Sequence, residues 1–177
     1  MARWALPLLF ALTLLGADAP KHVKSPTASQ AFTSAQGAAA VWVDPAKWTR
    51  VQSTQENVRT FMFYTGQAQA RLITSNESRT PDVQLEETLE RIRKNDPEAR
   101  VVFSEPRNVN DVDLLCVQIE TALTEDTKAI YFGYLFGDSE RTVQLFVVTE
   151  QSVLSRFFKD FTVLLDGLVV EGPNAGF

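Results

Sequence analysis

Two residues suited to nucleophilic or metal chemistry occur once each in this 177-residue chain, His22 and Cys116. A Ser-His-Asp or Cys-His site needs a histidine within the folded domain, and zinc needs several His or Cys ligands. His22 lies in a polar segment ahead of the expected domain, where we expect it to be solvent-exposed and without a role. Nucleophilic catalysis is therefore possible only if that segment folds back onto the domain. Cys116 lies inside an apolar strand, which favours a buried, inert thiol over a reactive one.

Acidic residues are the other candidates for chemistry. Asp111-Val112-Asp113 and Glu125-Asp126 are turn acids without the spacing of an EF-hand, which favours solvated turn residues over a cation site. Two carboxylates in a cleft could still hydrolyse a glycosidic bond, but 22 acids place some pairs close in any fold. We assign no catalytic, cofactor-binding or metal-ligating residue and expect no cofactor; the binding residues are unknown at this stage.

Three further residues have two interpretations each. Asn76-Glu77-Ser78 matches the N-x-S glycosylation pattern, which matters only in a host that glycosylates exported proteins. Trp42 and Trp48 flank a turn at Pro45. We expect them to cover the end of a sheet beside a helix; the alternative is a partner-binding hot spot, because tryptophan is enriched in such sites.

The first nineteen residues have the pattern of an export signal. A short basic start at 1–4 is followed by an apolar run at 5–15 and an A-x-A pattern at 17–19. The run is too short to span a bilayer as a helix. Pro20 is unfavourable in the first mature position, so cleavage falls a few residues away or the segment is retained as an anchor. The chain is expected to be exported, to a periplasm or the exterior, or to a lumen in a eukaryote or plastid.

The remainder is expected to form one acidic domain. Residues 20–38 are rich in Ser, Thr, Ala and Gln and predict a flexible spacer. Residues 39–170 form the domain, and 171–177 a tail. The net charge of −5 argues against nucleic-acid binding. No integral membrane segment is expected in the mature chain, and one cysteine cannot form an intrachain disulfide.

A strand at 142–148 leading into a long amphipathic helix is the strongest structural signal. Seven apolar residues form one stripe at helical spacing, as a core-facing helix requires: Leu154, Phe157, Phe158, Phe161, Leu164, Leu165 and Leu168. Ser152 or Thr149 is expected to cap the N-terminus, and Gly167 to take a left-handed conformation at the C-terminus.

The other elements follow from turn and breaker residues. Short strands are predicted at 40–43 and 48–52, a hairpin at 59–64 and 68–74 around Gly66, and a helix from Thr80-Pro81 to a stop at Asn95-Asp96-Pro97. Strands follow at 100–104, with a break at 105–108, then at 113–123, 129–136 and 142–148, with turns at 110–111, 124–127 and 137–140. Short turns between consecutive strands predict an α+β fold with a mainly antiparallel sheet.

The opening Val41-Trp42-Val43-Asp44-Pro45-Ala46-Lys47-Trp48, the closing strand and helix, and the element order between them resemble the PsbP-like superfamily over about residues 39–170. The family includes lumenal PsbP proteins of photosystem II, a Ran-binding release factor and DcrB-type exported proteins. The resemblance implies an α-β-α sandwich and a binding or assembly role. No family motif residue with a defined role maps onto this chain.

These observations favour an exported, non-enzymatic binding or assembly module with a protein partner of unknown identity. The first alternative is a ligand carrier with a pocket between the sheet and a helix. The second is a carboxylate-based hydrolase. A fold that serves such different partners does not by itself decide among them.

Overall fold

The computed structural model describes residues 21–37, 39–124 and 127–171. The predicted signal peptide at 1–19, residues 172–177 of the predicted tail and the turn acids Glu125-Asp126 lie outside the described residues. In chain order the elements are β1 (Gln30–Thr33), β2 (Ala39–Val43), β3 (Trp48–Val51), β4 (Val58–Phe63), β5 (Ala68–Ser75), α1 (Pro81–Arg93), β6 (Arg100–Val109), β7 (Val112–Ala122), β8 (Lys128–Gly137), β9 (Thr142–Glu150), α2 (Gln151–Leu165) and β10 (Leu168–Val170).

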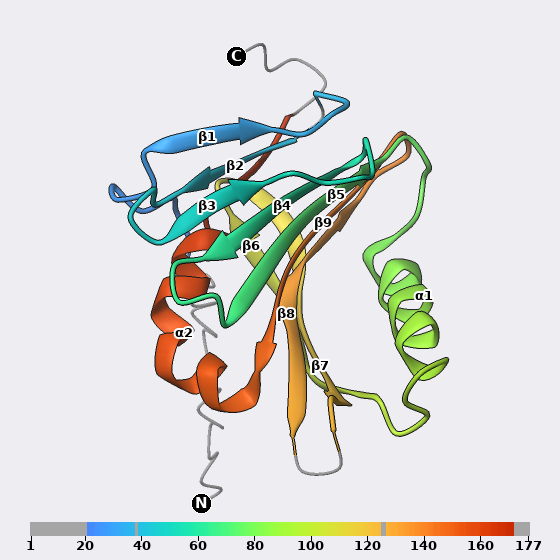
Figure 1. Ribbon diagram of the computed structural model, residues 1–177. Helices are drawn as coiled ribbons and strands as arrows, with labels where there is room; N and C mark the ends of the chain where they lie inside the picture. The colour runs from blue at the N-terminus through green and yellow to red at the C-terminus, as the bar shows by residue number, and fades with distance from the viewer. Residues whose placement is uncertain (1–20, 38, 125–126, 172–177) are drawn as a thin grey trace, which may run out of the picture.

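The middle layer is a seven-stranded antiparallel sheet in the order β3-β4-β5-β9-β8-β7-β6 (Figure 1). Helix α1 packs on β7 and β8 from one side, and α2 packs on β8 and β9 from the other. A second sheet, in the order β1-β2-β10, lies on the same side as α2 and shares its core. The predicted α+β fold with helices on both faces of an antiparallel sheet is confirmed.

The segment predicted to be a flexible spacer, residues 20–38, is part of the fold wherever the structure describes it, so that prediction is wrong there. Strand β1 pairs with β2, and Phe32 packs against the main core. The backbone N–H of His22 donates to the carbonyl of Asn108 (3.0 Å), and the N–H of Asn110 donates back to His22 (2.9 Å). Backbone pairing holds a segment with too few apolar residues to show a pattern.

Strand β6 runs unbroken through the predicted break at 105–108. It is an edge strand, the position in a sheet where proline is tolerated, because one side of the strand has no ladder partner. The predicted turn at Asn110-Asp111 is confirmed: both residues have positive φ, 49° and 64°, as a tight two-residue hairpin turn requires.

The predicted helix beginning at Thr80-Pro81 is confirmed as α1. It is capped by Thr80, whose side-chain oxygen accepts from the N–H of Val83 (3.4 Å), and Pro81 is its first residue. Its buried residues cover a smaller core against β7 and β8.

Helix α2 differs from its prediction at both ends and in the middle. Its N-cap is Glu150, without a side-chain cap bond. It bends at Phe157, whose φ and ψ of −114° and 20° are non-helical. The bend shifts the helical phase, so Val153 joins the buried face while Phe158 is 43% exposed.

The helix ends at Leu165, and Leu168, which the apolar stripe placed on the helix, instead pairs with β2 as part of β10. Gly167 has no positive φ among the residues described. A side chain there is excluded by packing, since a Cβ would lie 2.1 Å from the carbonyl oxygen of Trp42.

Candidate functional site

A row of hydrogen-bonded polar side chains lies on the α2 side of the sheet. It includes the single histidine, His22, and passes near the single cysteine, Cys116. The hydroxyl of Tyr134 donates to Asp166 (2.7 Å), and Nδ1 of His22 lies 3.4 Å from the other Asp166 carboxylate oxygen. Arg107 donates to Tyr134 (3.4 Å) and to Glu105 (2.6 Å). We call these five residues the polar chain. The expectation that His22 is solvent-exposed is wrong: its side chain is half-buried, and its backbone pairs with the β6–β7 turn.

Burial controls the chemistry of this region. Burial raises the pKa of the Cys116 thiol to about 12. Burial, followed by the hydrogen bond to Asp166, also raises the pKa of Tyr134 above its ordinary value. Burial by itself lowers the pKa of Arg107, but hydrogen bonds to Tyr134 and Glu105 raise it on balance. Tyr134 and Cys116 are therefore neutral at pH 7, and Arg107 is charged.

Nucleophilic catalysis required the N-terminal segment to fold back, and it does: His22 lies beside the carboxylate of Asp166. However, Tyr134 and Cys116 are both 0% exposed, so a substrate cannot reach either group. Cys116 confirms the prediction of a buried thiol. The polar chain is a structural connection between the N-terminal segment, β6, β8 and the end of α2.

Asn110 completes that connection. Its side-chain amide donates to the carbonyls of Asp166 (2.8 Å) and Leu168 (2.7 Å), and its side-chain oxygen accepts from the N–H of Lys24 (2.9 Å). One asparagine thus joins the N-terminal segment, the β6–β7 turn and the α2–β10 junction.

A pocket of about 220 Å³ brings acids together at the other end of β7. Asp96 accepts from the N–H of Ala122 (2.6 Å) and the hydroxyl of Thr121 (2.7 Å), and these bonds lower its pKa. The hydrogen bond from Lys128 (2.8 Å) is the main cause that lowers the pKa of Glu120. A glycosidase general acid needs a raised pKa, so these acids do not have the properties that the hydrolase alternative requires.

Asp111 and Asp113 are exposed, as expected of solvated turn acids, and each has one polar partner. Asp111 pairs with Lys21 (2.9 Å), and Asp113 accepts from the side-chain amide of Asn108 (2.8 Å). Within the described residues, no group of three His, Cys, Asp or Glu side chains is placed to hold a metal ion.

An open groove of about 540 Å³ lies between α2 and the strands β6, β7 and β8. We call it the α2 groove; its lining residues are Val102, Gln118, Glu120, Ile130, Gln151, Leu154, Ser155 and Phe158. Val102 and Phe158 are 45% and 43% exposed. Phe158 stacks on Phe132, with ring centroids 5.3 Å apart, so its position is fixed. The lining of the groove combines four apolar and four polar side chains.

Sequence reasoning missed this groove. Val102 and Phe158 are 56 positions apart, and the helical stripe predicted Phe158 to be in the core. The bend at Phe157, which carries no proline or glycine signal, is what turns Phe158 outward.

The structure favours a packing role for the two tryptophans. Trp48 is 2% exposed and packs against Phe63 and Phe161, with ring centroids 5.0 and 5.8 Å away. Trp42 is half-buried beneath the ammonium of Lys24, 4.4 Å from its ring centroid. Trp48 is thus a core residue, and Lys24 covers one face of Trp42.

Asn76, in the N-x-S pattern, is exposed in the loop between β5 and α1.

Comparison with solved structures shows the fold. No protein-family model matches the sequence, and no curated protein is significantly similar to it. The cyanobacterial PsbP (CyanoP) of Synechocystis sp. PCC 6803 is similar over 80% of this chain and 92% of that chain, with a TM-score of 0.63 at 10% identity. The Ran-binding protein Mog1p of Saccharomyces cerevisiae is similar over 80% and 94%, with a TM-score of 0.55 at 6% identity. A Pseudomonas aeruginosa protein of unknown function is similar over 71% and 99%, with a TM-score of 0.50 at 12% identity.

The resemblance to the PsbP-like fold is thus confirmed at the level of the fold. Identities this low carry no residue role from those proteins to this chain. Across the described ranges, neither α1 nor α2 has both the length and the apolar character to cross a bilayer.

Proposed function

We propose that this protein is a non-enzymatic binding or assembly module whose partner docks in the α2 groove. The observation that carries the proposal is a pair of exposed apolar side chains, Val102 and Phe158, on opposite walls of one groove. Aromatic side chains held in place lose little entropy when a partner covers them, which makes them effective anchors. That Mog1p is a Ran-binding protein supports binding as a role for this fold.

Affinity capture from the native source tests this function. The full chain should recover one protein repeatedly, and Phe158→Glu should reduce that recovery at least about tenfold, because a buried charge replaces an apolar anchor. Val83→Glu is the matched control: Val83 is 46% exposed on α1, on the opposite side of the sheet. Repeated capture with no partner, or equal capture by both variants, would contradict the proposal.

A ligand carrier is the second candidate, and the same groove favours it. Its volume of about 540 Å³ falls within the range of small-molecule sites, roughly 300 to 1,000 Å³. A thermal-shift screen with apolar acids and aromatic compounds distinguishes the two. A carrier should gain several degrees with one chemical class, and Phe158→Glu should abolish the gain. If no compound stabilises the protein, the carrier function is not supported.

We further propose that the chain is exported through its N-terminal segment. The support is the basic start, apolar run and A-x-A pattern of residues 1–19. N-terminal sequencing of the protein from its native source is the test. A mature chain beginning within a few residues of Pro20 supports cleavage, whereas a cytoplasmic protein starting at Met1 contradicts export.

A further inference from the structure

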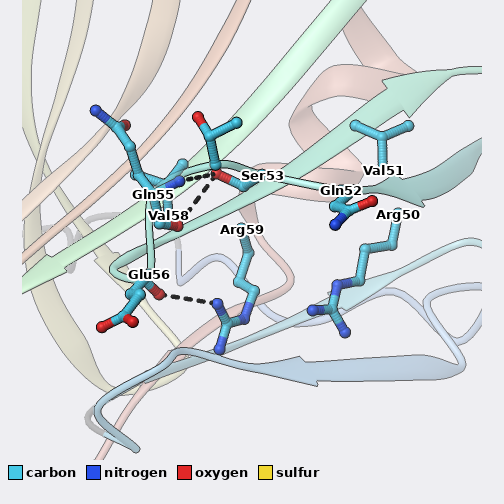
Figure 2. Close-up of a pocket in the computed structure, with 9 residues that line it drawn as sticks. Arg50, Val51, Gln52, Ser53, Gln55, Glu56, Val58 and Arg59 are labelled. Carbon is cyan, nitrogen blue, oxygen red and sulfur yellow. Dashed lines mark hydrogen bonds between the residues drawn. The ribbon is translucent and has the colours of Figure 1, made fainter.

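A second polar pocket lies at the far end of the sheet from the α2 groove. It measures about 160 Å³ and is formed by the end of β3, the loop from 52 to 57 and the start of β4. Figure 2 shows its lining, with the guanidinium groups of Arg50 and Arg59 extending the same way from the two strands, toward β1. The strand register explains this: Arg50 is opposite Phe61, and Arg59 lies two positions before it, so both are on the Phe61 face.

Both arginines keep most of their donors available. Arg59 donates one bond, to the carbonyl of Glu56 (3.0 Å), and Arg50 lies over the ring of Phe32 (6.0 Å to the centroid). Within the described residues neither forms an ion pair. Glu56 lines the pocket, but its carboxylate points away from both guanidinium groups in Figure 2. Two neighbouring arginines without an ion-pair partner in the described part of the chain stand out where the net charge is −5.

The loop between β3 and β4 forms one wall of the same pocket. Ser53, Gln52 and Gln55 line it, and Ser53 orders the loop: its hydroxyl accepts from the N–H of Gln55 (3.1 Å) and donates to the carbonyl of Gln55 (3.2 Å). The two guanidinium forks match the oxygens of a tetrahedral anion. The volume suits one phosphate group rather than a whole nucleotide.

We propose that Arg50 and Arg59 form a binding site for a phosphate group, separate from the α2 groove and independent of the function proposed for it. The phosphate belongs either to a small soluble ester or to a lipid headgroup. Both present the same oxygens to the two arginines.

Titration with inorganic phosphate, followed by the side-chain Nε–Hε NMR signals of the arginines at constant ionic strength, tests the site. The signals of Arg50 and Arg59 should shift and saturate, and Arg59→Gln should weaken binding at least about tenfold. Arg71→Gln is the matched control, because Arg71 is opposite Thr60 and so on the other face of the sheet. Linear, non-saturating shifts, or equal weakening by the two variants, would overturn the proposal.

Co-sedimentation with vesicles distinguishes the two sources. Binding to phosphatidylglycerol vesicles but not phosphatidylcholine vesicles, lost in Arg59→Gln, assigns the phosphate to a headgroup. Saturable phosphate binding without co-sedimentation assigns it to a soluble ester.

Discussion

At the scale of single residues, Asn110 contributes more to stability than a turn residue usually does, because its side chain joins three segments. Replacing it with glycine keeps the positive φ but removes three hydrogen bonds. We expect Asn110→Gly to lower the free energy of unfolding by about 2 to 4 kcal/mol, since buried carbonyls lose their donor. Urea denaturation measures this.

Its control is Asp111→Gly, one position along at the same positive φ. Asp111 makes only an exposed ion pair with Lys21, so the effect should stay within about 0.5 kcal/mol. Equal destabilisation by both variants would show that the turn, and not the side-chain connection, matters.

Tyr134 predicts a loss of stability in alkali. Burial and the bond to Asp166 raise its pKa in the folded state, so above the ordinary tyrosine pKa of about 10 the unfolded chain releases a proton that the folded one keeps. Stability from this group is complete below pH 10 and falls as pH rises past it. Between pH 9 and 11 wild type should lose about 1.4 kcal/mol more than Tyr134→Phe. Urea midpoints at both pH values measure the difference; parallel losses would contradict the assignment.

At the scale of elements, α2 divides into residues that build the core and residues that face the groove. Phe161 is 0% exposed, and its ring centroid lies 5.1 Å from that of Phe63. Phe161→Ala should cost about 3 to 5 kcal/mol of unfolding free energy. Phe158→Ala, at an exposed position, should cost about 1 to 2 kcal/mol, and the half-buried Val163→Ala less than about 1 kcal/mol. Equal shifts in the urea midpoint would show that the assigned face is wrong.

The sequence predicted most elements because each had a local signal. Alternation and turn residues located the hairpins, and Thr80-Pro81 located the start of α1. Strand β1 was missed because its pairing with β2 is made by backbone groups and its only core side chain is Phe32. The α2 groove was missed because it depends on a bend at Phe157 and on contacts across distant strands. Local signals do not determine either feature.

At the scale of the whole molecule, the N-terminal segment closes the fold. It covers the β6–β7 turn through His22 and supplies β1 to the small sheet. A chain beginning at residue 39 should therefore unfold at least about 10 °C below one beginning at residue 21, since it loses a strand and the cover over Phe61. Circular dichroism melting measures this. Equal melting temperatures would restore the flexible-spacer interpretation.

Site-directed photo-crosslinking in the native source tests partner binding through the α2 groove most directly. A photoreactive amino acid in place of Ser155, exposed on the groove wall, should form one discrete adduct with the partner. The same residue in place of Val83, on the opposite side of the sheet, should form none. An adduct from position 83 alone, or no adduct from position 155, would contradict the account.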